Sequence, residues 1–185
     1  VRGIYAYVAD FGDGLKIIDV SDPTLPKIKG SYNTPGNAYD VFLKNNVAYI
    51  ADDSSLQILD ITNLASPKFK GTYGNLSDAY SVCVSGTLAY VTDGKNGLQI
   101  IDVSDVTAPE LIGNYNTAGF AYKVYASGTT IYIADGIAGF QTIKNKCCKC
   151  DNDSKPPKGC ISGTIRDSSG KPLSDKNVIL KRISP

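Results

Sequence analysis

The sequence predicts an all-β protein built from β-propeller blades, each of four antiparallel strands. Two short patterns that recur at a constant period carry this prediction. The first is a strand-like segment, Ala-Tyr-Val-Ala-Asp with small variations, at residues 6–10, 48–52, 89–93 and 131–135. The second, Leu-x-Ile-Ile-Asp-Val, stands at residues 15–20, 56–61 and 98–103 and decays at 140–144. The tyrosines of the first pattern are 42, 41 and 42 residues apart, which indicates a true structural repeat.

Each repeat divides into four short segments with the character of β-strands. In the second unit these are residues 39–44, 47–52, 56–61 and 68–73. They are rich in Val, Ile and Tyr, they alternate apolar with polar residues, and Asn, Asp, Ser or Pro separates them. Four strands within about 40–45 residues is the blade unit of a β-propeller. Because one blade cannot bury both faces of its sheet, we expect neighbouring blades to stack on one another.

The repeated residues resemble the LVIVD repeat. The shared pattern runs from Gly-Leu-x-Ile-Ile-Asp-Val-Ser-Asp through a proline and Gly-x-Tyr to Ala-Tyr-Val-Ala-Asp, and it covers about residues 1–143. The resemblance implies a β-propeller in a bacterial or archaeal protein that is exported or attached to the cell surface. The fourth unit departs from the pattern, since Lys144 stands where the earlier units have Asp19, Asp60 and Asp102.

We therefore expect propeller repeats over residues 1–144, in units of about 1–37, 38–78, 79–120 and 121–144. Val1 aligns inside the first strand of a unit, and the array ends after a third strand, so about three and a half blades are expected. We expect them to be part of a larger ring, with a small four-bladed ring closed by a borrowed strand as the alternative. Open blade edges expose unpaired backbone groups. Other protein chains, or the rest of the same chain, are the expected partners across these edges.

A cysteine-rich linker is expected over residues 145–160. Cys147, Cys148, Cys150 and Cys160 lie among Asp, Lys, Pro and Gly, in a segment too short and polar to form its own core. Two disulfides would cross-link such a segment, in any of three pairings. A zinc site made of thiolates and free or intermolecular thiols are the alternatives. Cys83, by contrast, falls on an inner strand and is expected to be a buried thiol.

The last residues, 161–185, contain two strand-like segments around an Asp-Ser-Ser-Gly turn. This stretch resembles the start of carboxypeptidase regulatory-like β-sandwich modules. The resemblance implies a partial spacer or adhesion module, as found in exported proteins.

Composition excludes several kinds of chemistry. The 185 residues contain no His, Met or Trp. Without His there is no Ser-His or Cys-His nucleophile pair and no His metal ligand. Residues 1–143 carry nine basic against 14 acidic side chains, a poor match for nucleic acid, which binds basic faces. No apolar run approaches the ~20 residues of a membrane-spanning helix, so we expect no membrane span in this segment.

Acidic turns after the second strand of each unit are the candidates for a metal site. Asp10 with Asp13, and Asp93 with Asn96, could contribute oxygen ligands to Ca²⁺. Asp and Asn before Gly are also what a tight hairpin requires. We therefore expect a structural role here, with calcium as the alternative, and we expect no catalytic residue, no other cofactor and no other metal ligand.

Two further sets of residues repeat. Asp19, Asp60 and Asp102 each end a strand before Ser or Thr and are expected to accept backbone N–H groups at that corner. Another set of aromatic residues begins the innermost strand near one rim of the expected channel: Tyr39, Tyr80 and Tyr122. They are candidates for binding a sugar or a peptide, with packing between blades as the alternative.

The sequence thus favours a non-enzymatic scaffold, extracellular or on the cell surface, that mediates protein or glycan interactions or surface assembly. One alternative is a propeller-channel enzyme, a lyase or hydrolase, with its site outside this segment. Another is a subunit of an extracellular filament or sheath.

Overall fold

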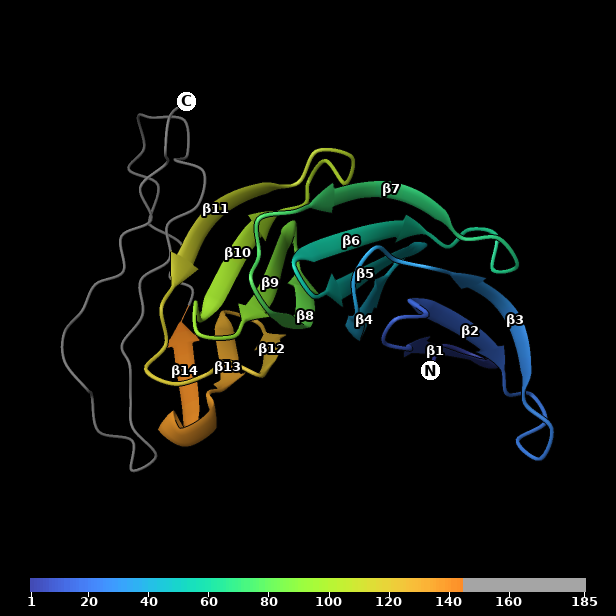
Figure 1. Cartoon of the computed structure of the whole chain (residues 1–185), viewed down its shortest axis with the longest axis horizontal. Helices are drawn as coiled ribbons and strands as arrows, with labels where there is room; N and C mark the ends of the chain where they lie inside the picture. The colour runs from blue at the N-terminus through green and yellow to red at the C-terminus, as the bar shows by residue number, and fades with distance from the viewer. Residues whose placement is uncertain (145–185) are drawn as a thin grey trace.

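The computed structural model describes residues 1–144. Over this range the chain forms antiparallel strands and one three-residue 3-10 turn, Gly136–Ala138. Four sheets follow one another along an arc, and we call each sheet a blade (Figure 1). The prediction of an all-β fold with propeller-type blades is confirmed. Within these residues no helix is long and apolar enough to cross a membrane.

The strands of each blade are paired in chain order. Blade 1 contains β1 (Tyr5–Ala9), β2 (Leu15–Asp19) and β3 (Lys27–Tyr32). Blade 2 contains β4 (Ala38–Lys44), β5 (Val47–Asp52), β6 (Ser55–Asp60) and β7 (Lys68–Tyr73). Blade 3 contains β8 (Ala79–Ser85), β9 (Leu88–Asp93), β10 (Leu98–Asp102) and β11 (Glu110–Tyr115). Blade 4 contains β12 (Lys123–Ser127), β13 (Thr130–Ala134) and β14 (Phe140–Lys144). The first strands β4, β8 and β12 lie against one another, and β3, β7 and β11 follow the outer side of the arc (Figure 1).

Alternation along each strand gives a blade two buried faces. In β5, Tyr49 and Ala51 belong to the cluster shared with blade 3, whereas Ala48 and Ile50 belong to the cluster shared with blade 1. Successive side chains of a strand point to opposite faces, so a strand covered on both faces reads as a nearly continuous apolar run. The core is accordingly three clusters between blades, with no single centre.

A backbone bridge joins each neighbouring pair of blades. The residue after the repeated aspartate pairs with the alanine that begins the next blade, in three places: Phe11 with Ala38, Asp53 with Ala79, and Gly94 with Ala121. Phe11 and Ala38 exchange two N–H···O bonds, of 2.9 and 3.0 Å. All three alanines are buried between two blades, which accounts for a small residue at this position.

The aspartates that end the third strand-like segment of each repeat cap the following corner. The carboxylate of Asp19 accepts the N–H of Ser21 at 2.9 Å, and that of Asp60 accepts the N–H of Thr62 at 2.8 Å. Asp102 makes the same bond to Ser104. Hydrogen bonds from the Ser21 side chain and then from its backbone N–H hold the pKa of Asp19 below its usual value. The expected corner role is confirmed.

Repeated glycines on the outer strands allow neighbouring blades to touch. A Cβ atom on Gly30, in β3, would lie 2.1 Å from the carbonyl oxygen of Leu64 in the blade 2 corner. A Cβ atom on Gly71, in β7, would lie 2.2 Å from the carbonyl oxygen of Val106 in the blade 3 corner. No side chain fits at such distances, so the glycine of the Gly-x-Tyr pattern is an inter-blade contact.

The expected features beyond Lys144 lie outside the described residues. These are the linker with Cys147, Cys148, Cys150 and Cys160, and the β-sandwich module at 161–185. Cys83 lies within them, on β8, where it is 3% exposed and its sulfur accepts the N–H of Ala126 at 3.3 Å. Burial raises the pKa of its thiol, and the expectation of a buried free thiol is confirmed.

The outer-strand contact predicts that alanine substitution destabilises the protein much more at one glycine than at another. We expect Gly71→Ala to lower the free energy of unfolding by about 1–3 kcal/mol, because the new methyl group must displace the backbone of the next blade. Gly74→Ala is the matched control, since a Cβ atom there meets nothing within 4 Å. Urea unfolding of both variants measures the difference, and equal stability of the two would contradict the contact.

Candidate functional site

Five aromatic side chains form a continuous row that crosses all four blades: Phe11, Tyr39, Tyr80, Phe120 and Tyr122. We call this row the aromatic ladder. Successive ring centroids lie 5.6 Å apart for Phe11–Tyr39, 4.9 Å for Tyr39–Tyr80 and 5.6 Å for Tyr80–Tyr122. The ring of Phe120 lies 5.4 Å from that of Tyr80 and 4.7 Å from that of Tyr122. The rim candidates taken from the sequence are therefore in mutual contact.

The repeat places the three ladder tyrosines in line. Each follows the buried alanine of an inter-blade bridge, and in blades 2 and 3 the pairing register shifts at this tyrosine, as in a β-bulge. Tyr39 and Tyr80 are the second residues of β4 and β8, and Tyr122 directly precedes β12. Tyr39 is 39% and Tyr122 51% exposed, so much of the ladder is open to a ligand.

Phe11 belongs to the ladder although its backbone is unfavourable for such a residue. It has φ of 47°, in the left-handed region, and the residue is 56% exposed. The equivalent positions in the next two blades hold Asp53 and Gly94, with φ of 54° and 52°. A bulky side chain in this conformation is uncommon, and the similar φ at the equivalent positions shows that the repeated turn imposes it. Neither Phe11 nor Phe120 falls on a repeated aromatic position, which is why the sequence did not reveal them.

Two carboxylates lie beside the ladder. A Cβ atom on Gly94 would lie 2.9 Å from the Phe120 ring and 3.1 Å from an Asp78 carboxylate oxygen, so ring and carboxylate flank the same glycine. Burial, followed by the charge of Asp78, raises the pKa of Tyr80, and Asp53 acts in the same direction. The ion pairs of the described residues include neither Asp78 nor Asp53.

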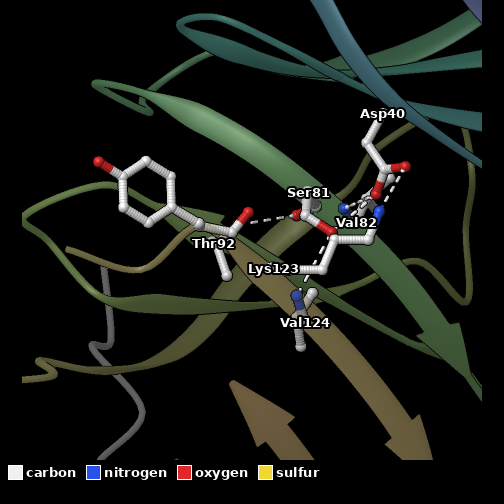
Figure 2. A network of polar contacts seen from close by, with 7 residues as sticks. Asp40, Ser81, Val82, Thr92, Lys123 and Val124 are labelled. Carbon is white, nitrogen blue, oxygen red and sulfur yellow. Dashed lines mark hydrogen bonds and ion pairs between the residues drawn. The ribbon is translucent and has the colours of Figure 1, made fainter. Parts of the chain in front are cut away.

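A polar network joins the residues that directly follow the three ladder tyrosines in the chain (Figure 2). The hydroxyl of Ser81 donates to Asp40 Oδ2 at 2.7 Å, and the N–H of Val82 donates to the same oxygen at 3.0 Å. Lys123 Nζ lies 2.9 Å from Asp40 Oδ1, and the N–H of Val124 donates to Ser81 Oγ at 3.3 Å. The network ties the first strands of blades 2, 3 and 4 together.

This network gathers an acid, a hydroxyl and a cation that sequence reasoning did not bring together. Asp40, Ser81 and Lys123 share one register position, immediately after the tyrosine of each unit, and this common position is the signal that could have revealed them. Ser81 is 0% exposed, and its hydroxyl both donates to Asp40 and accepts from Val124. A hydroxyl so enclosed holds blades together and is not placed to attack a substrate.

The repeated aspartates at the end of the second strand-like segment anchor the linkers between blades. Each carboxylate accepts a backbone N–H from the linker that enters its own blade: Gly36 to Asp52 at 2.9 Å, Ser77 to Asp93 at 2.7 Å, and Gly119 to Asp135 at 2.9 Å. All three carboxylates are buried. The sequence suggested that these aspartates stabilise only their own hairpin turn. In the structure they also hold the linker, because each of these bonds joins residues 16 positions apart.

The four calcium candidates lie in two separate turns. Asp93 and Asn96 are neighbours in the turn after β9, where the side-chain amide of Asn96 donates to Asp93 Oδ2 at 3.1 Å. Asp93 Oδ1 also accepts the N–H groups of Ser77 and Asp78, each at 2.7 Å. Asp10 and Asp13 lie in the turn after β1, where Asp13 pairs with Lys16 at 3.2 Å. In residues 1–144 no three acidic or cysteine side chains gather as a metal site would require.

Comparison with protein families identifies three repeats. Residues 1–34, 35–75 and 77–117 match the LVIVD repeat, and together they make up more than half of the chain. Comparison with curated proteins gives no match.

The linker anchors give a prediction for Asp93. We expect Asp93→Asn to lower the free energy of unfolding by about 1.5–3 kcal/mol, the usual value of hydrogen bonds to a buried charged group. The new amide cannot accept from the linker and from Asn96 at once. Asp13→Asn is the control, since its side chain is 71% exposed and a surface ion pair contributes about 0–1 kcal/mol. Urea unfolding compares them, and equal losses would contradict the anchor.

Proposed function

Because the chain belongs to the LVIVD repeat family, we propose that it is a non-enzymatic scaffold, extracellular or on the cell surface, that binds another protein or a glycan. The aromatic ladder is the observation that carries this proposal. Exposed aromatic rings that touch one another form a continuous apolar surface, and such surfaces mark interaction sites. The tyrosines add hydroxyl groups, which suit a partner that is partly polar.

The backbone that carries the ladder supports a binding surface. Tyr39 and Tyr80 belong to the paired strands β4 and β8, and the N–H of Tyr122, directly before β12, donates to the carbonyl oxygen of Ala134 at 2.9 Å, so all three rings are carried on hydrogen-bonded elements. A rigid surface loses little conformational freedom when a ligand binds, and this improves affinity. The chemistry of the polar network supports the non-enzymatic part, because the Ser81 hydroxyl is buried and engaged. A catalytic site outside the described residues is the alternative.

A second candidate function, assembly with other copies, is favoured by the two outward faces of the array. Val8, on blade 1, occupies the position of Ile50 but is 38% exposed where Ile50 is 0% exposed. Phe140, on blade 4, occupies the position of Leu98 but is 54% exposed where Leu98 is 0% exposed. At every interface inside the array, the face that carries the Leu98 position packs against the face of the next blade that carries the Ile50 position. The blade 4 face of one copy therefore fits the blade 1 face of a second copy, in a head-to-tail contact that builds a ring or a filament.

The binding proposal predicts a loss of affinity on truncating the ladder. We expect Tyr39→Ala and Tyr122→Ala each to weaken binding about tenfold, because each removes an aromatic contact. The measurement is a binding titration against a panel of defined oligosaccharides and synthetic peptides. Phe69→Ala is the control, since Phe69 is 53% exposed on β7, outside the ladder. Unchanged binding by both tyrosine variants would contradict the proposal.

The assembly candidate predicts a complementation experiment. We expect the 185-residue chain to increase in mass with concentration in light scattering, and Val8→Asp and Phe140→Asp each to be monomeric alone. Each variant retains one intact face, so mixing the two restores a dimer and nothing larger. Ile28→Asp, on the exposed outer strand β3, is the control and should assemble like the original chain. A monomeric original chain at high concentration would exclude assembly of this kind.

A further inference from the structure

One end of the aromatic ladder has the composition of a cation site. The rings of Tyr80, Phe120 and Tyr122 form a triangle with centroid separations of 5.4, 5.6 and 4.7 Å. A cation is attracted to a ring face when it lies within about 6 Å of the centroid. Tyr80 meets Phe120 and Tyr122 edge to face, at interplanar angles of 66° and 63°, so a cation beside this cluster lies over one ring face and near the other two rings.

Carboxylates lie beside this triangle, although two exposed lysines adjoin the same residues, Lys95 next to Gly94 and Lys123 next to Tyr122. Asp78 flanks Gly94 together with the Phe120 ring, and the charges of Asp78 and Asp53 both raise the pKa of Tyr80. Of these two lysines, Lys123 is already paired through its Nζ with Asp40 at 2.9 Å. The surface therefore combines aromatic rings with carboxylates that have no cation of their own among the described ion pairs.

We propose that the aromatic ladder binds an extended peptide segment of a partner protein through its Arg or Lys side chains, with one cation held at the cluster of Tyr80, Phe120 and Tyr122 beside Asp78. This rests on the proposed binding function and names the class of ligand. A neutral sugar can stack on aromatic rings, but it gains nothing from the negative charge of Asp78 and Asp53. A cation gains from both the rings and the carboxylates. Additional basic side chains of the same segment reach Tyr39 and Phe11 along the row.

The glycine at position 94 fits this arrangement. Gly94 has φ of 52°, and any side chain there would collide with the Phe120 ring or with Asp78. Because no atom fills this position, the ring edge and the carboxylate approach the same point from two sides. The site is thus formed by Tyr80 on β8, by residues of the linkers before β8 and β12, and by the turn after β9.

The test uses the whole 185-residue chain and four labelled probes. These are a peptide of alternating Arg and Gly, the same peptide with Lys for Arg, the same peptide with Gln for Arg, and a neutral β-linked glucose oligosaccharide. Fluorescence anisotropy gives the dissociation constants. We expect the Arg and Lys peptides to bind, and the Gln peptide and the oligosaccharide to bind at least about tenfold more weakly.

Matched variants distinguish binding at the cation site from general electrostatic attraction to the acidic residues of the chain. We expect Asp78→Asn and Tyr122→Leu each to weaken the Arg peptide about fivefold or more, since each removes one part of the cation site. Asp22→Asn removes the same charge from an exposed corner, and Phe69→Leu removes a ring outside the ladder, so both should stay within about twofold. Equal weakening by Asp78→Asn and Asp22→Asn would overturn the proposal, because attraction to the acidic body would then explain the binding.

Two other results distinguish this proposal from the function on which it rests. Preferred binding of the oligosaccharide, weakened by Tyr122→Leu, would overturn the cationic ligand and leave the ladder as a binding surface. Binding of the probes that is unaffected by either Tyr122→Leu or Tyr39→Ala would overturn both.

Discussion

The stacking of one blade on the next is the constraint on which the rest of the structure depends. A four-stranded sheet of this size has two apolar faces and cannot cover either by itself. Residues of each interior strand therefore alternate between two neighbours, as Ile50 and Tyr49 do. The small alanines of the bridges, the outer-strand glycines and the anchored linkers all allow two sheets to approach closely. They recur because the same approach recurs at every interface.

The strands and their period could be predicted because local chemistry determines them. Val, Ile and Tyr in alternation, separated by Asp, Asn and Pro, specify short strands wherever they stand in the chain. The corner role of Asp19 could also be predicted, because its partner, Ser21, is only two residues away. In these cases the contact lies within one unit, and one unit of sequence contains both partners.

The candidate site was only partly predictable because its contacts join different units. Tyr39, Tyr80 and Tyr122 stand at a repeated position, so the sequence pointed to them. Phe11 and Phe120 stand where other units have different residues, and their contacts with Tyr39 and Tyr80 form between neighbouring blades. The bond between Ser81 and Asp40 likewise spans 41 residues and joins unlike side chains at one register position.

The linker anchors have a consequence for how such an array can lengthen. Asp93 binds the linker that enters its own blade, and Asp52 does the same for the linker before it. A duplicated stretch of about one period would therefore carry a set of strands, the connection leading into them and the carboxylate that fixes that connection. The anchor of the new copy would need no partner from the neighbouring units. Growth by whole units is built into the chemistry of a single buried side chain.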